Sequence, residues 1–426
     1  MSSIMTNTSA MVALSTLKNI NSNLSKTQSD ISTGKSVATA KDNAAVWAIS
    51  KVMESDVKGF TTISDSLALG QSTVAVASSA SEKVTDLLTT MKQKITAAQE
   101  SNVDRAKIQT DITALKNQID SITGAAQFNG LNLLSNKKGA ATVAQIVGNT
   151  GAGANVLGSG SIDILSSLDR STTGVTASNI TVRKADLGTS AHAAGAGTDI
   201  AAGAISASTA IAIGAQGTIT IAGDTATAVR AGNKVLAGDT YTLGGLTGVT
   251  GSVEYVARDG DTVDDISAGL AAKLNFFAAN SGVAITASAG SSGGTLTITN
   301  NTGAALTVTG AAKTAGTAGG GMELLSSFDV TTDNGASAAL GAIESMIQTA
   351  TKAAAAFGSS AGRIETQSDF VKSLTDSMKT GIGSLVDADM EEASARLQAL
   401  QTQQQLGIQA LSIANQQPQN ILSLFK

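Results

Sequence analysis

Residues 60–98 read FTTISDSLALGQSTVAVASSASEKVTDLLTTMKQKITAA, and apolar or small residues recur here at alternating spacings of three and four. Such a repeat places one narrow apolar stripe along a helix, as in a coiled coil. The spacing predicts a coiled-coil-like helix from about residue 44 to residue 99, roughly 80 Å long. The stripe consists of Phe60, Ile63, Leu67, Gly70, Val74, Ala77, Ser81, Val84, Leu88, Met91, Ile95 and Ala98.

The same spacing occurs twice more in the chain. A second stripe follows Asp104, which we expect to cap a helix that ends near Gly124. A third stripe covers residues 340–385, and its helix is a natural partner for the first two. The chain therefore begins and ends in one helical bundle, and the residues between form an insertion. The second stripe is Ile108, Ile112, Leu115, Ile119 and Ile122; the third is Leu340, Ile343, Ile347, Ala350, Ala354, Phe357, Ala361, Ile364, Ser368, Val371, Met378, Ile382 and Leu385.

The composition is typical of narrow helix stripes and thin sheets rather than of one deep core. Aromatic residues make up only 3% of the 426 residues, and Pro418 is the only proline. Helices can therefore run far, because almost nothing removes a backbone donor from their interiors. The net charge is −5, and Lys and Arg form no basic stripe, which argues against nucleic-acid binding. Cysteine is absent, which excludes disulfides and thiolate metal sites.

The N-terminus shows no sign of a targeting segment. Its opening residues, MSSIMTNTSAMVALSTLK, lack a basic stretch followed by a continuous apolar stretch, so we expect no Sec-type signal peptide. No run of about 18 apolar residues occurs, so we expect neither a membrane span nor a membrane partner. Leaving the cell would require another route.

The two ends of the chain differ from the bundle in their charge. Residues 1–17 and 397–425 contain no charged side chain. Surface helices of monomers usually carry charges on the outer face, so we expect these ends to be covered by more protein. A buried leucine contributes about 1.5–3 kcal/mol, whereas ordering each residue costs about 1–2 kcal/mol. One thin stripe thus predicts ends that are mobile alone and become helical on assembly. The stripes are Ala10, Leu14, Leu17, Asn21, Leu24, Gln28 and Ile31, and Met390, Ala393, Leu397, Leu400, Ile408 and Leu411.

The middle of the chain, from about residue 136 to residue 327, is rich in Gly, Ala, Ser and Thr. Short alternating segments bounded by glycine predict strands. Residues 262–279 show a helical period instead. We therefore expect a small sheet with one helix in a solvated surface module. The predicted strand segments are 217–224, 240–246, 251–260, 282–290, 295–301 and 305–310.

No group of residues indicates an enzyme. His192 is the only histidine, and we interpret it as a solvated loop residue because catalysis needs convergent groups. The acidic run at 259–265 lacks the glycine and the closing glutamate of an EF-hand loop, so Asp261 or Thr262 is expected to cap the next helix. Residues 319–321, Gly-Gly-Gly, lack the lysine of a phosphate loop and are interpreted as a return linker. We expect no catalytic, cofactor or metal site.

Three strings resemble motifs of the bacterial flagellins. Residues 24–50, LSKTQSDISTGKSVATAKDNAAVWAIS, are similar to the N-terminal signature of that family, with Ala-Lys-Asp-Asn-Ala-Ala at 40–45. Residues 128–130 resemble its Phe-Asn-Gly turn. Residues 386–426 resemble its closing helix, including Ala-Asn-Gln-Gln-Pro-Gln-Asn at 414–420. The resemblance covers both ends of the chain and not the middle.

The resemblance implies an α+β fold. Both chain ends would form a long coiled-coil-like helical hairpin or bundle, with an inserted β-rich outer domain. Residues 1–42 and 386–426 would be the terminal helices of a filament core. Residues 43–185 and 328–385 would form the helical bundle with a β-hairpin-like part, and 186–327 the inserted surface domain with one helix.

The resemblance also implies a function. The chain would self-assemble head-to-tail into the helical filament of the bacterial flagellum, after export in unfolded form by the flagellar type III apparatus, and would lie outside the cell. Its partners would be copies of itself, sister flagellins, an export chaperone and cap or junction proteins. The self-assembly seam is expected to comprise Leu14, Leu17, Leu24, Ile31, Met390, Leu397, Leu400, Ile408 and Leu411, with Gly34 as a turn residue.

Three other interpretations remain open at this point. A hook–filament junction protein shares the terminal helices, although the Ala-Asn-Gln-Gln-Pro-Gln-Asn ending favours a flagellin. A stalked surface adhesin would need a signal peptide or an outer-membrane anchor. An enzyme carried on a filament would need a site that the sequence does not offer.

Overall fold

The computed structural model describes residues 7–136, 160–171, 174–200, 204–206, 210–222, 235–291 and 293–424. The chain divides into two compact units. The first comprises Met1–Asp65 with Asp369–Lys426, and the second comprises Ser66–Ser368. Two helices, α2 (Ala44–Ala97) and α6 (Asp333–Val386), contribute residues to both units.

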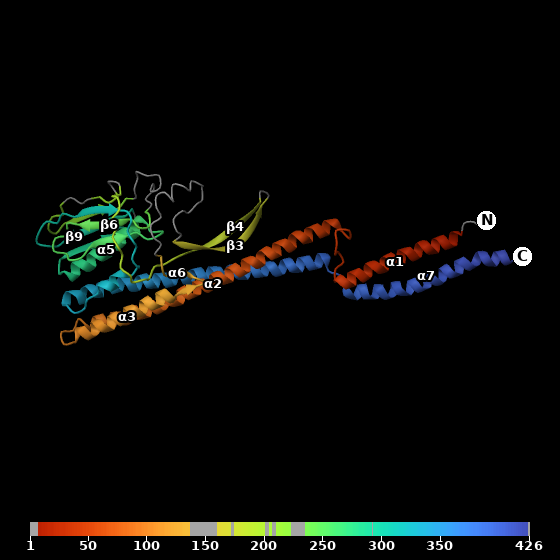
Figure 1. Cartoon of the computed structure of the whole chain (residues 1–426), viewed down its shortest axis with the longest axis horizontal. Coiled ribbons are helices and arrows are strands. Elements are labelled where there is room, and N and C mark those ends of the chain that lie inside the picture. The colour runs from red at the N-terminus through yellow and green to blue at the C-terminus, as the bar shows by residue number, and fades with distance from the viewer. Residues whose placement is uncertain are drawn as a thin grey trace. The chain divides into compact units, whose positions relative to one another are not determined.

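The second unit contains the predicted bundle, in which α2, α3 (Arg105–Ala125) and α6 run alongside one another (Figure 1). The α2 stripe is buried at every predicted position from Leu67 to Ala98. Asp104 caps α3 as predicted, because its carboxylate accepts a hydrogen bond from the Lys107 N–H at 3.2 Å. The side chains that α3 and α6 bury include Ile112, Ile119, Ile343, Ala350, Phe357 and Ile364.

A tight turn follows α3 and accounts for the Phe-Asn-Gly string. Strand β1 (Gln127–Phe128) pairs antiparallel with β2 (Leu131–Asn132). Between them Asn129 and Gly130 have φ values of 50° and 77°. A two-residue hairpin turn with positive φ at both positions favours Asn-Gly. The Asn132 side chain then donates to the Thr123 carbonyl at 2.7 Å and holds the turn against the end of α3.

A second hairpin packs on the bundle. Strands β3 (Ser161–Ser171) and β4 (Gly174–Arg183) pair antiparallel, with a register shift between Leu165 and Ser167. The Ile164 side chain lies so close to Gly70 of α2 that an added Cβ there would overlap it. Gln367 of α6 donates to the Ser166 carbonyl at 2.9 Å. The glycine in the α2 stripe therefore serves close approach of the hairpin.

The described residues of the insertion form two three-stranded antiparallel sheets and one α-helix around a shared apolar core (Figure 1). Tyr241, Ile266, Leu270, Leu274 and Ile298 are at most 1% exposed in this core. One sheet has the order β10 (Thr309–Lys313), β6 (Thr240–Gly244), β7 (Val253–Val256); the other has β5 (Gln216–Thr220), β9 (Thr295–Asn300), β8 (Ile285–Ala289); and the helix is α5 (Val263–Asn280).

Most of the predicted elements of the insertion are confirmed, including the cap of α5. The Thr262 hydroxyl accepts from the Asp265 N–H, and Asp265 accepts in return from the Thr262 N–H. The strand predicted at 305–310 was placed too early, because β10 begins at Thr309. Leu306 does alternate into the core at 2% exposure, but its backbone pairs with Ile211 and not with a named strand.

The α+β fold expected from the sequence is confirmed: in the sequence, helices at both chain ends flank an inserted β-rich part. No helix among the described residues is both long and apolar enough to cross a bilayer. The first unit contains α1 (Thr8–Thr33), α7 (Met390–Leu424), the part of α2 up to Asp65 and the part of α6 from Asp369 onward.

Leu88 and Leu69 provide a matched test of the α2 stripe, because Leu88 is 0% and Leu69 is 51% exposed. Leu88→Ala should lower the free energy of unfolding by about 2–5 kcal/mol, since it leaves a cavity in a packed interior. Leu69→Ala should change it by less than about 0.5 kcal/mol. Urea unfolding of the unpolymerised protein, followed by far-ultraviolet circular dichroism, measures both. Equal losses would contradict the assignment of the stripe.

Candidate self-assembly interface

The terminal helices α1 and α7 lie side by side and run antiparallel (Figure 1). At one end the Asn7 amide donates to the Ala414 carbonyl at 2.8 Å. Further along, the Gln404 amide donates to the Asn21 side-chain oxygen at 2.7 Å. The Asn7 side chain also accepts from the Ala10 N–H at 3.0 Å and so caps α1. The pair is thus joined by neutral side chains.

The predicted seam residues fall into two groups. Six are partly or fully shielded, and among them Leu400 is only 7% exposed. Three remain open to water, namely Leu14 at 48%, Met390 at 44% and Ile408 at 55%. The shielded six are Leu17, Leu24, Ile31, Leu397, Leu400 and Leu411.

The shielded face of α1 differs in detail from the predicted stripe. Ala13, Ile20 and Thr27 are shielded, whereas Asn21 and Gln28 are exposed. The predicted stripe and the observed shielded face both keep the spacing of three and four. They share Ala10, Leu17, Leu24 and Ile31. The apolar Ile20 beside the polar Asn21 was the signal in the sequence that favours the observed face.

A glycine on α7 permits close approach of the two helices. A Cβ on Gly407 would lie 3.2 Å from Cδ1 of Leu17, which is tight for side-chain packing. Gly407 and Gln404 lie on the shielded face of α7 together with Ala393 and Ala414. Small residues at such positions let helix backbones come near each other.

Gly34 forms the junction between the terminal pair and the helices that follow. It ends α1 in the left-handed conformation with φ of 69°. Its carbonyl accepts from the Ala388 N–H at 3.0 Å, and the Ser36 N–H donates to Val386 at 2.8 Å. The segment after α1 and the segment before α7 are therefore held together by backbone hydrogen bonds.

The Ala-Lys-Asp-Asn-Ala-Ala motif has a local role beside this junction. The Asp42 carboxylate accepts from the N–H and the hydroxyl of Thr39, both at 2.9 Å, and these bonds lower the pKa of Asp42. Asn43 accepts from the Val46 N–H at 3.3 Å as α2 begins. Asp389 does the same for α7, because it accepts from the Glu391 N–H at 2.9 Å. Asp42 thus fixes the turn before α2, and Asn43 and Asp389 bind the first turns of α2 and α7.

Apolar side chains also remain on the outside of the terminal pair. We call Met11, Val12, Leu14, Leu406, Ile408 and Ile413 the outer apolar set; each is at least 48% exposed. Leu406 and Ile413 are seven residues apart and so lie on one side of α7. Charged residues do not separate them, because residues 397–425 contain none. Exposed apolar patches of this kind mark interaction surfaces.

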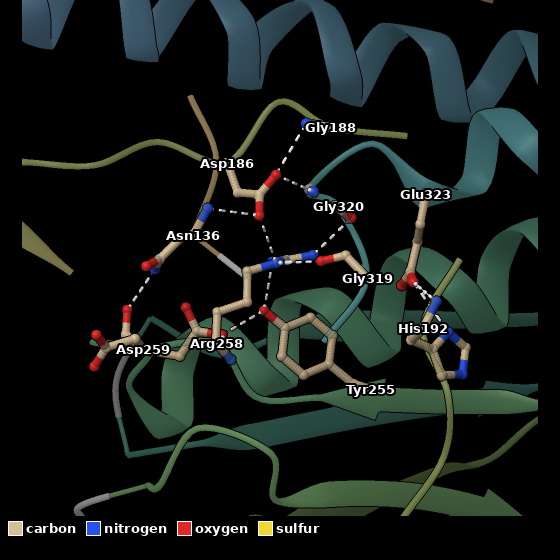
Figure 2. Close-up of polar contacts among 12 residues, drawn as sticks. Asn136, Asp186, Gly188, His192, Tyr255, Arg258, Asp259, Gly319, Gly320 and Glu323 are labelled. Atoms are coloured by element: carbon tan, nitrogen blue, oxygen red, sulfur yellow. Dashed lines mark hydrogen bonds and ion pairs between the residues drawn. The ribbon is translucent and has the colours of Figure 1, made fainter. Parts of the chain in front are cut away.

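The other residues that the sequence singled out lie in the second unit. His192 was predicted to be a solvated loop residue, and this was wrong: its side chain is 20% exposed. Its Nδ1 lies 2.9 Å from Glu323 Oε2 and 3.3 Å from Lys273 Nζ, and its Nε2 lies 3.5 Å from Glu254 Oε2 (Figure 2 shows the Glu323 contact). These partners are far away in the sequence.

The charges around His192 form a paired cluster rather than a ligand site. Burial raises the pKa of Glu323, but His192 and the Lys273 ammonium outweigh it and lower the pKa to about 2. Burial lowers the pKa of Lys273 in spite of this partner. Among the described residues, no three His, Cys, Asp or Glu side chains are grouped as metal ligands.

Comparisons with known proteins agree with the arrangement of the two chain ends. Residues 4–139 match the family described as bacterial flagellin N-terminal helical region, and residues 340–425 match the bacterial flagellin C-terminal helical region. The chain is 35% identical to Flagellin A of Rhizobium meliloti and 34% identical to Flagellin D of that organism, each over the full length of both chains. Flagellin FljM of Caulobacter vibrioides is 28% identical over 100% of this chain and 99% of its own.

Solved structures with similarity to the chain include FliC from Burkholderia pseudomallei. It is 13% identical with a TM-score of 0.30, and the match covers 69% of this chain and 99% of FliC. The flagellar hook associated protein-3 from Legionella pneumophila is 12% identical with a TM-score of 0.35, covering 79% and 98%.

Gly34 and Gly381 test the junction with opposite expected signs. Gly34→Ala should destabilise the first unit by about 1–2 kcal/mol, because an L-residue is strained at this φ. Gly381→Ala should stabilise it by about 0.5–1 kcal/mol, because the new Cβ meets only Met53 Cε, at 3.5 Å, inside a helix. Hydrogen exchange at the Ser36 and Ala388 amides reports both changes. Exchange at these amides that is unchanged or slower in Gly34→Ala would contradict the role of Gly34.

Proposed function

The chain belongs to the bacterial flagellin family and is a structural subunit of the flagellar filament, and from this premise we propose that its copies polymerise through the terminal helix pair. Membership of a structural family confirms that the protein is not an enzyme. The observation that carries the proposal is the outer apolar set on helices whose ends have no charge. Such a surface is suited to burial against further copies.

The terminal pair shields little of its own surface. Among the described side chains, α1 buries only Thr27, and α7 buries only Leu400 and Ala414. Three buried side chains cannot offset a cost of about 1–2 kcal/mol for each ordered residue. We infer that neighbouring subunits supply the missing contacts, and that both ends are mobile in the free subunit.

The seam in this proposal has an inner and an outer part. The inner part is the shielded group Leu17, Leu24, Ile31, Leu397, Leu400 and Leu411, which joins α1 to α7 within one subunit. The outer part includes Leu14 and Ile408, together with Met390 at the start of α7. Contacts between unlike faces of successive copies do not close, and so generate an open helical filament.

The same surface bears on partners before and after assembly. We propose that a flagellar export chaperone covers the uncharged part of the C-terminal helix, from residue 397 onward, inside the cell, because an exposed apolar helix face invites aggregation. The unfolded chain then leaves through the flagellar type III apparatus and is secreted to the filament outside. Sister flagellins and cap or junction proteins would meet the filament through matching terminal helices.

The relatives also bear on the alternative of a hook–filament junction protein. The curated relatives named above are flagellins, and each matches this chain along almost its whole length. This favours an abundant filament subunit. The stalked adhesin and the filament-borne enzyme gain no support from any described site.

Leu400 tests the inner part of the seam. Leu400→Asp should abolish polymerisation, because it places a charge in a dry helix interface. Leu400→Met, which nearly conserves volume, should polymerise, with a stability loss of less than about 1.5 kcal/mol. Electron microscopy of concentrated, purified protein checks both. Wild-type-like filaments from Leu400→Asp would contradict the proposal.

Ile413 tests the outer part, with Ile213 as its control. The two isoleucines are 68% and 61% exposed, but Ile213 lies in the insertion. Ile413→Asp should leave the circular dichroism of the free subunit unchanged and raise the concentration needed for polymerisation. Ile213→Asp should leave that concentration unchanged. Light scattering across a dilution series measures it, and equal behaviour of the two variants would rule out the outer part.

A further inference from the structure

The insertion joins the bundle through a neck, formed by its entry segment 184–193 and its exit segment 317–323, and α5 also contacts the segment before α6 through the stacked rings of Phe276 and Phe328. The two segments pair through backbone hydrogen bonds of 2.8–2.9 Å: Ala193 with Thr317 in both directions, Gly320 with Ser190, and Met322 with Gly188. The entry segment also binds the segment that follows β2, since the Leu187 N–H donates to the Leu134 carbonyl at 3.1 Å. The neck thus connects three stretches of chain.

One carboxylate joins these three stretches. Asp186 accepts from the Asn136 N–H at 3.1 Å, from Gly188 at 2.9 Å and from Gly321 at 3.2 Å (Figure 2). The Asp186 side chain is only 3% exposed. A buried carboxylate needs compensation for its charge.

The compensating cation comes from the core of the insertion. Arg258 follows β7, and its Nε lies 4.0 Å from Asp186. The same guanidinium donates to the Gly319 carbonyl at 3.1 Å and to the Gly320 carbonyl at 2.8 Å (Figure 2). It also donates to the Tyr255 hydroxyl at 2.8 Å, which itself donates to Asp261. Because a guanidinium is planar and its donors are fixed in a fork, it can donate to several acceptors at once only in one orientation.

A second ionic contact holds the neck from the other side. Glu323 follows the exit segment glycines and forms an ion pair with Lys273 of α5. It also accepts from the His192 N–H at 3.2 Å. The entry segment, the exit segment and α5 therefore meet at one carboxylate.

The three glycines at 319–321 make this pairing sterically possible. A Cβ on Gly320 would overlap the Gly188 carbonyl, and one on Gly321 would overlap the Asp186 carbonyl. The glycine string interpreted as a return linker is therefore also the place where entry and exit segments touch.

We propose that Arg258 is a positioning residue that locks the insertion in one orientation on the bundle, and that without it the insertion turns as a folded unit about the neck. Arg258 connects the neck with the core of the insertion, because its side chain donates to Gly319 and Gly320 of the exit segment and to the hydroxyl of Tyr255, whose ring is buried in that core. Copies with an intact lock present the same face of the insertion at every position of a polymer. This inference concerns the neck and does not depend on the assembly seam.

The test uses the unpolymerised full-length chain, which has no cysteine of its own. Ile213→Cys in the insertion and Lys352→Cys on α6 are both exposed and accept spin labels. Arg258→Met should abolish the single narrow peak in the distance distribution. It should also remove hydrogen-exchange protection at Gly320 and Met322, while Ile219 and Ile298 in the sheet stay protected. Lys313→Met, at an exposed ion pair with Asp199, is the matched control and should change neither.

Two further variants separate positioning from general stability. Arg258→Lys keeps the charge but not the planar fork, and should fail to restore the narrow peak. Gly320→Ala leaves every charge in place and should also abolish the peak, because its Cβ overlaps the entry segment. An unchanged peak in Arg258→Met or in Gly320→Ala would overturn the proposal. Loss of protection at Ile219 and Ile298 together with the neck would also overturn it, because Arg258 would then belong to the core.

Discussion

The bundle depends on the burial of one stripe along α2. From Leu67 to Ala98 this stripe is removed from water, and only partners with a helical repeat can cover it along such a length. Helices α3 and α6 supply that cover, and the ion pairs of Lys94 with Asp111 and of Lys92 with Glu344 flank it. The other elements of the second unit are attached to this bundle of α2, α3 and α6. The hairpin β3–β4 contacts α2 at Gly70, and the exit from the insertion is held by Gln109 of α3, which binds the backbone of Phe328 and Val330.

The terminal pair follows a different physical rule. Residues 1–17 and 397–425 carry amides and hydroxyls where the bundle carries charges, and the apolar residues of the terminal pair lie on more than one face. A helix with a charged outer face is complete within one subunit. Helix α7 carries no charge from residue 397 onward and exposes Leu406 and Ile413, and we propose that it becomes stable only when more protein covers it. In this proposal, the division between self-sufficient and assembly-dependent helices is encoded in the distribution of charge along the chain.

Much of this fold could be predicted because helical repeats and caps are local signals. The α2 stripe, the Asp104 cap and the Thr262 cap depend on residues within a few positions of each other. The shielded face of α1 was harder, since Leu14 is more apolar than Ala13 and both fit the spacing. His192 could not be placed, because Lys273 and Glu323 lie 81 and 131 positions further along. The last strand was misplaced because Leu306 alternates correctly but pairs with Ile211. Sequence pattern reports which side of an element is buried, and not which distant segment buries it.

The central claim is that the terminal helices are completed by neighbouring subunits, whereas the bundle is complete in each subunit. Hydrogen exchange compared between free subunits and filaments tests it most directly. The account predicts that amides of α1 and α7 exchange rapidly in the free subunit and slowly in the filament, while amides around Leu88 and Met91 are protected in both. Equal protection of α1 and α7 in the two states would contradict it.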